Sequence, residues 1–301
     1  MAHKALRIIG IVVLALVGLV VIAVGLIYLL SSRQLSHSYS VTPPPLVIGA
    51  DSATLARGRH LVEARLLCTD CHGPDLAGTV VADAMPLFGR FVASNLTRGT
   101  GGVGDKYSDQ DWIRAIRDGI RPNGKPMVFM PTAVFAGLAG EDLAAVVAYV
   151  KSVSPVNKEL PRTALGPIAR MLVAAGQAHL AAKTIDHGAP YPGRPAEGRT
   201  VEYGRYLVAT GGCYECHRTD LTGGEEVGPP GTPPSQNITP AGIGSWSEVD
   251  FLRAIREGKR PDGTSIHPFM PWQTYGKMTD DELGAIYLFL GTIPAKTTVI
   301  K

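Results

Sequence analysis

Cysteine is scarce in this sequence, with only four among 301 residues. So few cysteines exclude a small secreted domain held together by many disulfide bonds. Charged residues are also sparse, at 18%, and 29 Lys and Arg stand against 26 Asp and Glu. Nucleic-acid-binding domains concentrate basic residues, so this near balance argues against that class and predicts no nucleic-acid partner.

Acidic residues are missing from the whole N-terminal part of the chain, where the first one is Asp51. From Ile8 to Leu30 no residue is charged, and such a run is long enough for a helix that crosses a hydrocarbon layer of roughly 30 Å. Lys4 and Arg7 precede it. The positive-inside rule then predicts a single-pass anchor in a bacterial inner membrane, with the rest of the chain on the periplasmic side. A cleaved signal peptide is the alternative, but its apolar region is usually only about 7 to 15 residues long.

The sequence repeats itself. Segments of the first half recur in the same order in the second, among them SDQDWIRAIRDG, which becomes SEVDFLRAIREG, and FMP, which is identical. Each copy predicts three or so helices, since apolar periodicity follows capping residues and ends at glycine. In the two copies the first helix starts at about Leu55 and Val201 and runs into the cysteine motif, the middle one spans Ser108 to Gly119 and Ser247 to Gly258, and the last follows Gly140 and Thr279.

These patterns predict a mainly α chain with a transmembrane anchor and two tandem domains. The predicted parts are an anchor at 1–32, a proline-rich spacer at 33–50, a first domain at 51–155, a linker at 156–198 and a second domain at 199–301. Each domain has little apolar core of its own, so something bulky is expected at its centre. The linker should form a short helix after Pro167, which either packs between the domains or lies on the bilayer surface.

All four cysteines fall in two Cys-x-x-Cys-His motifs, which are Cys68, Cys71 and His72, and then Cys213, Cys216 and His217. Two thiols at this spacing can add to the vinyl groups of haem, and the next histidine then ligates the iron. A structural zinc site would need four ligands close together, and a redox dithiol or a disulfide would need no histidine. The motifs therefore predict two covalently attached haem c groups.

A haem iron with a proximal histidine has a sixth position, which the repeated FMP segment can supply. Met130 and Met270 stand at matching places, and the proline after each favours an extended turn. Met85, Met127 and His267 are competitors, but none has a counterpart in the other copy. We therefore expect Met130 and Met270 to be the distal ligands.

Other polar residues have simpler interpretations. Four arginines of the middle helices are expected on a solvated face, with pairing to a haem propionate as the alternative for one in each domain; these are Arg114, Arg117, Arg253 and Arg256. Three histidines, His60, His179 and His187, are expected on the surface or in spacers.

The repeated blocks, from N-[LI]-T through the middle helix and R-P-[ND]-G to F-M-P, resemble cytochrome c subunits of membrane-bound dehydrogenases for alcohols, aldehydes, sorbose and gluconate. The resemblance covers both repeats and implies class I cytochrome c domains with Met130 and Met270 as axial ligands. Those subunits usually carry three haem domains and attach near their C-terminus, whereas this chain has two such motifs and an apolar N-terminal segment. That order also resembles the di-haem subunit of cbb-type oxidases and other anchored di-haem cytochromes.

The sequence thus predicts a membrane-anchored electron carrier of a respiratory or photosynthetic chain rather than an enzyme. Its expected partner is a redox protein, which could be a dehydrogenase, a quinol-oxidising complex, an oxidase or a photosynthetic reaction centre. One alternative is the electron-accepting subunit of a periplasmic dehydrogenase. Another is a di-haem peroxidase, which would need an open distal position at one haem.

Overall fold

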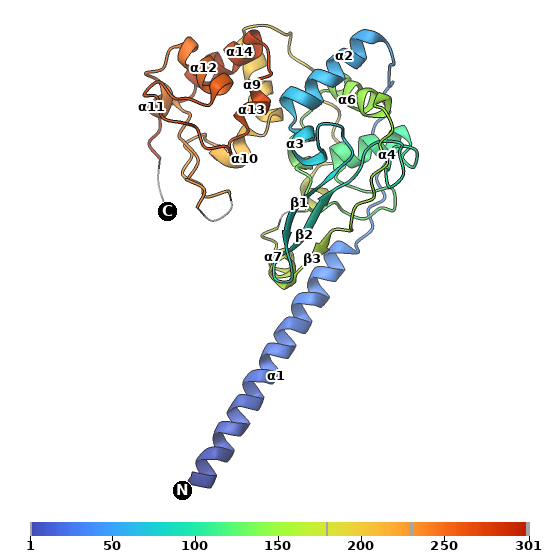
Figure 1. Cartoon of the computed structure of the whole chain (residues 1–301), viewed down its shortest axis with the longest axis vertical. Coiled ribbons are helices and arrows are strands. Elements are labelled where there is room, and N and C mark those ends of the chain that lie inside the picture. The colour runs from blue at the N-terminus through green and yellow to red at the C-terminus, as the bar shows by residue number, and fades with distance from the viewer. Residues whose placement is uncertain (1, 179, 229–230, 299–301) are drawn as a thin grey trace.

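The computed structural model describes residues 2–178, 180–228 and 231–298. A single long helix, α1 (Ala2–Leu35), projects from a head made of two helical lobes (Figure 1). We call the lobe built by residues 52–152 the first domain and the lobe built by residues 201–291 the second domain. The arrangement confirms the prediction of an apolar N-terminal helix followed by two mainly α domains.

Each domain consists of short helices joined by long loops. Those of the first domain are α2 (Ser52–His60), η1 (Leu61–Arg65), α3 (Cys68–His72), α4 (Asp109–Ile113), η2 (Arg114–Asp118), α5 (Thr132–Phe135) and α6 (Gly140–Ser152). Those of the second domain are α9 (Val201–Thr210), α10 (Cys213–His217), α11 (Pro240–Ile243), α12 (Glu248–Glu257), α13 (Trp272–Tyr275) and α14 (Asp280–Gly291). Both η segments are π-helical.

In both domains the first and last helices cross at a glycine. A Cβ atom at Gly58 of α2 would overlap the carbonyl oxygen of Ala145 in α6, and one at Gly204 of α9 would overlap that of Ala285 in α14. Glycine is needed there because it lets two helix backbones approach closely. The two domains therefore share one framework, which accounts for the repeated GR-x-LV segment.

The middle helices begin and end as their sequences predict. Ser108 and Ser247 each form a capping box with the aspartate three residues later, and both side chains accept a hydrogen bond of 3.2 Å from that residue's backbone N–H. Gly119 and Gly258 follow with positive φ angles of 68° and 67°. Such left-handed glycines are common ends of helices.

The helix before each cysteine motif does not run straight into it, so that prediction was wrong. Leu67 in the first domain and Gly212 in the second take positive φ angles of 54° and 78° and start a new short helix at the first cysteine. The first domain also has one residue more than the second between the crossing glycine and this break. It is absorbed by the π-helical turn η1, since a π-bulge accommodates one extra residue within a helix.

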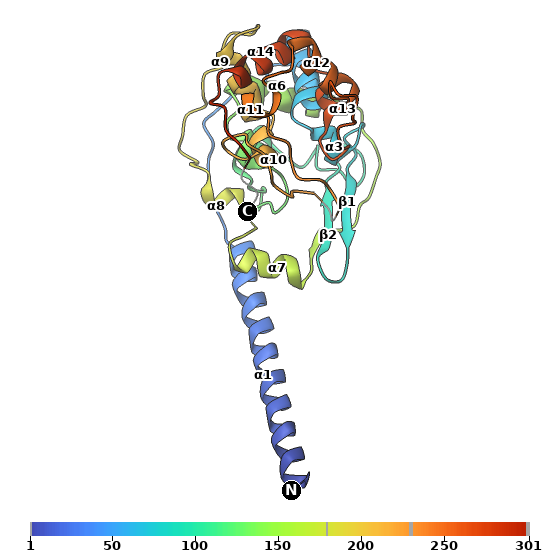
Figure 2. The same cartoon turned by 90° about the vertical axis from the view of Figure 1, so that its left-hand side faces the viewer.

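A small antiparallel sheet was not predicted. The hairpin β1 (Thr79–Ala84) and β2 (Gly89–Ala93) leaves the first domain just after its cysteine motif, and β3 (Ala164–Leu165) pairs with β2. In Figure 2 the hairpin extends toward the level of the upper end of α1. The described residues of the second domain contain no strand.

The segment after α1 follows the surface of the first domain. α1 itself continues to Leu35, three residues into the predicted spacer. Beyond it, the Tyr39 N–H donates to the Gly124 carbonyl oxygen (2.9 Å), and the Tyr191 hydroxyl donates to the Pro44 carbonyl oxygen (2.8 Å). Leu46 packs against the core of the first domain. The spacer is therefore docked along its length.

The linker forms the predicted helix after Gly166, α7 (Pro167–Ala174), and then a short α8 (Ala181–Thr184). α7 packs against the end of α1 and against the sheet, and it lies below the first domain, not between the domains (Figures 1 and 2). Of the two placements open from the sequence, the structure excludes the one between the domains.

Candidate functional site

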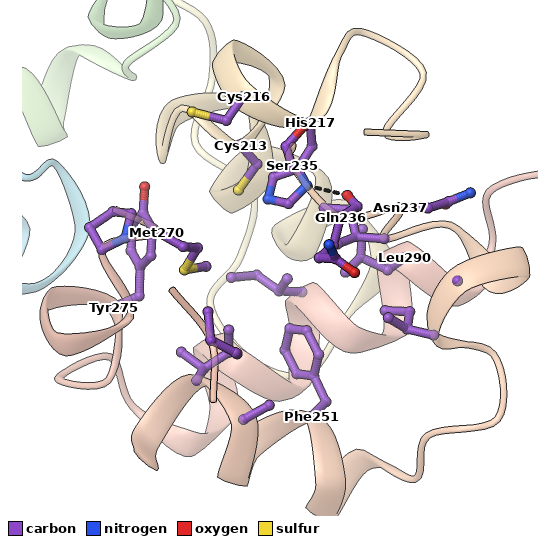
Figure 3. Close-up of a pocket in the computed structure, with 18 of the residues that line it drawn as sticks. Cys213, Cys216, His217, Ser235, Gln236, Asn237, Phe251, Met270, Tyr275 and Leu290 are labelled. Carbon is purple, nitrogen blue, oxygen red and sulfur yellow. Dashed lines mark hydrogen bonds between the residues drawn. The ribbon is translucent and has the colours of Figure 1, made fainter. Parts of the chain in front are cut away.

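A cavity of about 510 Å³ opens in the second domain. Its walls are largely apolar, with Leu207, Phe251, Ile255 and Leu290 among the lining residues, and the cysteine motif and Met270 also line it. Figure 3 shows how these side chains gather around it: His217 comes from α10 and Met270 from the segment before α13. The cavity thus brings together every residue that the sequence predicted for the second site.

The hydrogen bond of His217 determines which of its two ring nitrogens carries the proton. Its Nδ1 lies 2.7 Å from the carbonyl oxygen of Gln236 (dashed in Figure 3). A carbonyl only accepts, so Nδ1 carries the proton and Nε2 keeps a lone pair. Metal-ligating histidines typically hold their second nitrogen in this way.

The first domain repeats this arrangement. Nδ1 of His72 lies 2.8 Å from the carbonyl oxygen of Ser94, so Nε2 again keeps its lone pair. Cys68 and Met130 both pack against the apolar core of this domain. The buried indole N–H of Trp112 has no hydrogen-bond partner among the described residues, although such groups nearly always have one. A prosthetic group carrying acceptor oxygens fits that gap.

Burial controls protonation at both motifs. It raises the pKa of the Cys68 and Cys213 thiols to about 12, so these thiols are protonated at neutral pH. Burial also lowers the pKa of His72 and His217, although the hydrogen bond of each Nδ1 acts in the opposite direction. Neutral imidazoles of this kind are able to ligate a metal.

The zinc alternative finds no support in the described residues, because they bring no three His, Cys, Asp or Glu side chains together as a metal site requires. All four cysteines are free in the structure. The donor set instead consists, in each domain, of a cysteine pair, one imidazole and one thioether beside apolar walls. This set fits covalently attached haem.

Among the candidate distal ligands, Met130 and Met270 occupy the same turn. In both domains the residue two positions later donates its N–H to the methionine carbonyl oxygen, at 2.8 and 2.7 Å. Met85 lies instead in the exposed loop of the hairpin, with 49% of its surface accessible. His267 lines the cavity, but it is exposed and its Nδ1 accepts the N–H of Phe269 at 3.2 Å. Met127 lies near this turn, with its N–H bonded to Gly119.

The two domains meet through a pair of equivalent contacts. Nε2 of His60 lies 2.7 Å from a carboxylate oxygen of Glu282, and the Tyr206 hydroxyl donates to Asp142 at 2.6 Å. His60 and Tyr206 both follow the crossing glycine by two residues, and Asp142 and Glu282 match in the last helices. His60 is therefore an interface residue, and the prediction that it is a surface or spacer residue was wrong.

Arg65 is a buried cation at this interface, with 2% of its surface accessible. Its guanidinium donates to Thr210 at 3.1 Å, lies 3.7 Å from Asp142 and also lines the cavity of the second domain. Nearby, the Thr274 hydroxyl donates to Asp70 at 2.7 Å. The first cysteine motif thus touches the segment that follows Met270. No sequence signal marked Arg65, because its partners are far away in the sequence, Asp142 in the same repeat and Thr210 in the other.

The arginines were predicted only in part. Arg117 is buried, and it binds linker carbonyl oxygens at His187 and Ala189 instead of facing solvent, so its assignment to a solvated face was wrong. Arg256 bonds to the backbone around Met278. Arg260, at the start of the repeated R-P-[ND]-G segment, lines the cavity of the second domain as Arg65 does, and its counterpart in the first domain is Arg121. That repetition was the signal that could have identified them.

The remaining polar residues of the sequence analysis have structural roles where they are described. Arg114 bonds to Asp111 and to the Val41 carbonyl oxygen in the docked spacer, and Arg253 lies 3.3 Å from Asp250. His187 lies on the linker, where its Nδ1 is 2.9 Å from Asp118. His179 lies outside the described residues.

The family model for cytochrome c matches the chain twice, at residues 55–154 and 201–294. These matches cover well over half of the sequence, and each contains one cysteine motif and one FMP segment. The chain belongs to the cytochrome c family.

Similar proteins are cytochrome subunits of dehydrogenases. The chain is 27% identical to the fructose dehydrogenase cytochrome subunit of Gluconobacter japonicus over an alignment of 271 residues, which covers 84% of this chain and 55% of that protein. It is 35% identical over 102 residues to the cytochrome c subunit of the quinone alcohol dehydrogenase of Gluconobacter oxydans (strain 621H), covering 31% of this chain and 21% of that one. The gluconate 2-dehydrogenase cytochrome c subunit of Pantoea cypripedii is 36% identical over an alignment of 97 residues, which covers 30% of this chain and 22% of that protein. The chain thus spans about half the length of the first of these relatives and less of the others.

Proposed function

We propose that this protein is a membrane-anchored di-haem cytochrome c that accepts single electrons from a dehydrogenase and passes them to a membrane acceptor. One haem is attached at Cys68 and Cys71 with His72 and Met130 as iron ligands, and the other at Cys213 and Cys216 with His217 and Met270. The haem domains lie on the periplasmic side of a bacterial inner membrane. The protein carries electrons and has no substrate chemistry of its own.

The observation that carries the proposal is the duplicated imidazole geometry. His72 and His217 each donate Nδ1–H to a backbone carbonyl oxygen beside a cysteine pair, which leaves Nε2 available to a metal. In the second domain a methionine reaches the same apolar cavity from a separate segment. Two such sites in one chain favour an electron carrier, because thioether ligation blocks the open position that peroxide chemistry needs.

The bound haem supplies a reversible one-electron change at its iron, and the protein tunes it. The apolar walls of the cavity exclude water, and the carbonyl bonds hold the imidazoles in one orientation. Arg260, and Arg121 at the equivalent place, are our candidates to pair with haem carboxylates, since guanidinium suits that geometry. Burial lowers the pKa of Arg121, which a nearby carboxylate would offset.

The contact between the domains supports transfer of an electron from one site to the other. The hydrogen bond between Asp70 and Thr274 joins the first attachment helix to the segment that follows Met270. Arg65 spans from the first domain to the wall of the second cavity. Both sites are thus held against one shared interface.

The comparisons favour a dehydrogenase as the redox partner over an oxidase or a photosynthetic reaction centre. Three of the relatives are named as cytochrome subunits of fructose, alcohol and gluconate dehydrogenases. Purification from detergent-solubilised membranes through a tag on the C-terminus should therefore bring down a dehydrogenase catalytic subunit. Recovery of oxidase or reaction-centre subunits instead would identify one of those complexes as the partner and contradict the assignment to a dehydrogenase.

Haem attachment is tested directly by intact-mass spectrometry of the mature chain. We expect the mass of two haem groups on the wild type and of one on the double variant Cys213→Ala, Cys216→Ala. A wild-type mass with one haem or none would refute the proposal.

Axial ligation needs a separate measurement. Met130→Ala and Met270→Ala should each remove the low-spin His/Met signature of one haem in absorption and magnetic circular dichroism spectra. Met127→Ala and His267→Ala are the matched controls and should leave both signatures in place. Unchanged spectra in Met130→Ala or Met270→Ala would disprove that ligand.

A further inference from the structure

Five large apolar side chains are exposed on the underside of the first domain. They come from the loop of the hairpin and from α7, and we call them the apolar platform: Met85, Leu87, Phe88, Ile168 and Met171, of which 39% to 61% is accessible. The N–H of Ile168 donates to the carbonyl oxygen of Leu87 at 3.0 Å, so the two parts form one surface.

The platform faces away from the protein because of how α7 packs. Ala169 and Val173, four residues apart, are buried on one side of this helix. Ile168 and Met171, three residues apart, share its other side and are 39% and 46% accessible. An amphipathic helix normally buries its apolar residues, so an outer face with such residues indicates contact with something else.

α7 is fixed to the C-terminal end of α1. The guanidinium of Arg170 lies over the ring of Tyr28 at 4.8 Å and donates to the Ser32 hydroxyl at 3.1 Å. The Gln34 amide donates to the Val173 carbonyl oxygen at 3.0 Å. The platform therefore sits beside residues 28–34 of α1, and Figures 1 and 2 show α7 across that end of the helix.

The position along α1 identifies the occupant. α1 is apolar enough over His3–Leu35 to cross a membrane, and none of its apolar window is buried in the protein. Its apolar run ends at Leu30 and is followed by Ser31, Ser32 and Arg33, which places residues 28–34 at the boundary between hydrocarbon and headgroups. Tyrosine, and arginine with its charged end directed to the headgroups, are typical of that layer. The exposed apolar surface of α1 thus continues into the platform.

We propose that the apolar platform is a second membrane-contact surface, which lies in the outer interfacial layer of the bilayer beside α1. The proposal rests on the anchoring role of α1. With two contacts instead of one, the head cannot swing about the end of its helix, and the first domain faces the lipid through the hairpin and α7.

Site-directed spin labelling of the full-length holoprotein in phospholipid nanodiscs tests this surface. The four natural cysteines are consumed by haem attachment, so a single introduced cysteine takes the label. Labels go on Leu87→Cys and Met171→Cys, with Val17→Cys in α1 as the lipid reference and Val249→Cys, a 75% exposed residue of α12, as the aqueous reference. Ferrous haem keeps the iron diamagnetic, and its absorption spectrum verifies folding of each variant.

We expect the ratio of oxygen to nickel-chelate accessibility at Leu87→Cys and Met171→Cys to be several-fold higher than at Val249→Cys and lower than at Val17→Cys, because Val17 lies near the middle of the apolar run and the platform lies in the interfacial layer. An accessibility ratio like that of Val249→Cys at both platform sites would overturn the proposal that the platform contacts the membrane. Low accessibility to both reagents would also overturn it, since that would mean a covering protein. An aqueous result at Val17→Cys as well would instead reject α1 as the anchor.

Discussion

The first domain carries attachments that the described part of the second domain lacks, although both have the same framework. Both have a glycine crossing, a capped middle helix and an imidazole held by a carbonyl oxygen. The first domain adds the hairpin, a docked spacer and a linker helix fixed to α1. The common part surrounds the cysteine motif in each domain, and the additions join the first domain to α1.

The comparison also separates two kinds of buried charge. Asp142 is fully buried and bonds to Arg57 at 2.7 Å and to Tyr206 at 2.6 Å. Glu282, its equivalent, pairs with the partly exposed His60. Of these two equivalent carboxylates, Asp142 of the first domain is therefore the more enclosed, because the partner of Glu282 is partly open to water.

The largest effect should come from removing that carboxylate. Asp142→Ala leaves Arg65 buried with less opposite charge, so it should lower the free energy of unfolding by about 3–5 kcal/mol. Glu282→Ala should cost less, about 1–3 kcal/mol, because water can reach its partner. Urea unfolding of the holoprotein in detergent measures both, and equal losses would remove the distinction between the two carboxylates.

The shared framework is tested by the crossing glycines. Gly58→Val and Gly204→Val should each destabilise their own domain by about 1–3 kcal/mol or more, because the side chain would overlap a helix backbone. Haem content by intact mass should fall in the mutated domain. Gly291→Ala is the control, since the added Cβ has no described atom within 4 Å apart from its chain neighbours and the backbone of its own helix. Full haem loading with an unchanged melting temperature in Gly204→Val would mean that the crossing is not needed.

A smaller effect is expected from acid. Burial on its own would raise the pKa of Glu282, but the hydrogen bond and charge of His60, the Thr279 N–H and Arg65 bring it below its ordinary value of 4.5. A lowered carboxyl pKa stabilises the fold above the unfolded value, and this contribution is lost as the pH falls below about 4.5 toward the folded value. Glu282→Gln should therefore reduce the slope of stability against pH below that point, whereas the exposed Glu257→Gln should not. The same slope in both variants would assign the acid sensitivity to other groups.

The smallest effect concerns the attachments of the first domain. Tyr191→Phe removes the hydrogen bond to the Pro44 carbonyl oxygen and should cost about 1 kcal/mol. It should also speed limited proteolysis within residues 36–50. Tyr287→Phe, which removes a similar bond to Trp246 in the second domain, should cost about the same without affecting that cleavage. Equal cleavage rates would show that the spacer does not depend on Tyr191.

Local signals predicted much of this molecule. The capped middle helices and the duplicated framework follow from neighbouring residues and from comparing the two halves of the chain. The hairpin was missed because β1 is mostly exposed and its register shifts between Val80 and Ala82, so its sequence shows no regular apolar alternation. Arg65 and His60 were missed because each has a charge partner more than seventy residues away, and no local pattern reports such a pairing.

The paired contacts between His60 and Glu282 and between Tyr206 and Asp142 have the form of an isologous interface, in which equivalent residues meet across a twofold axis. Such an interface between separate chains must bind tightly enough to survive dilution. When both halves share one polypeptide, the tether supplies a high effective concentration and removes that requirement. The matching positions can therefore carry different residues without the two domains separating. His60 stands where the second domain has Tyr206, and Asp142 where it has Glu282.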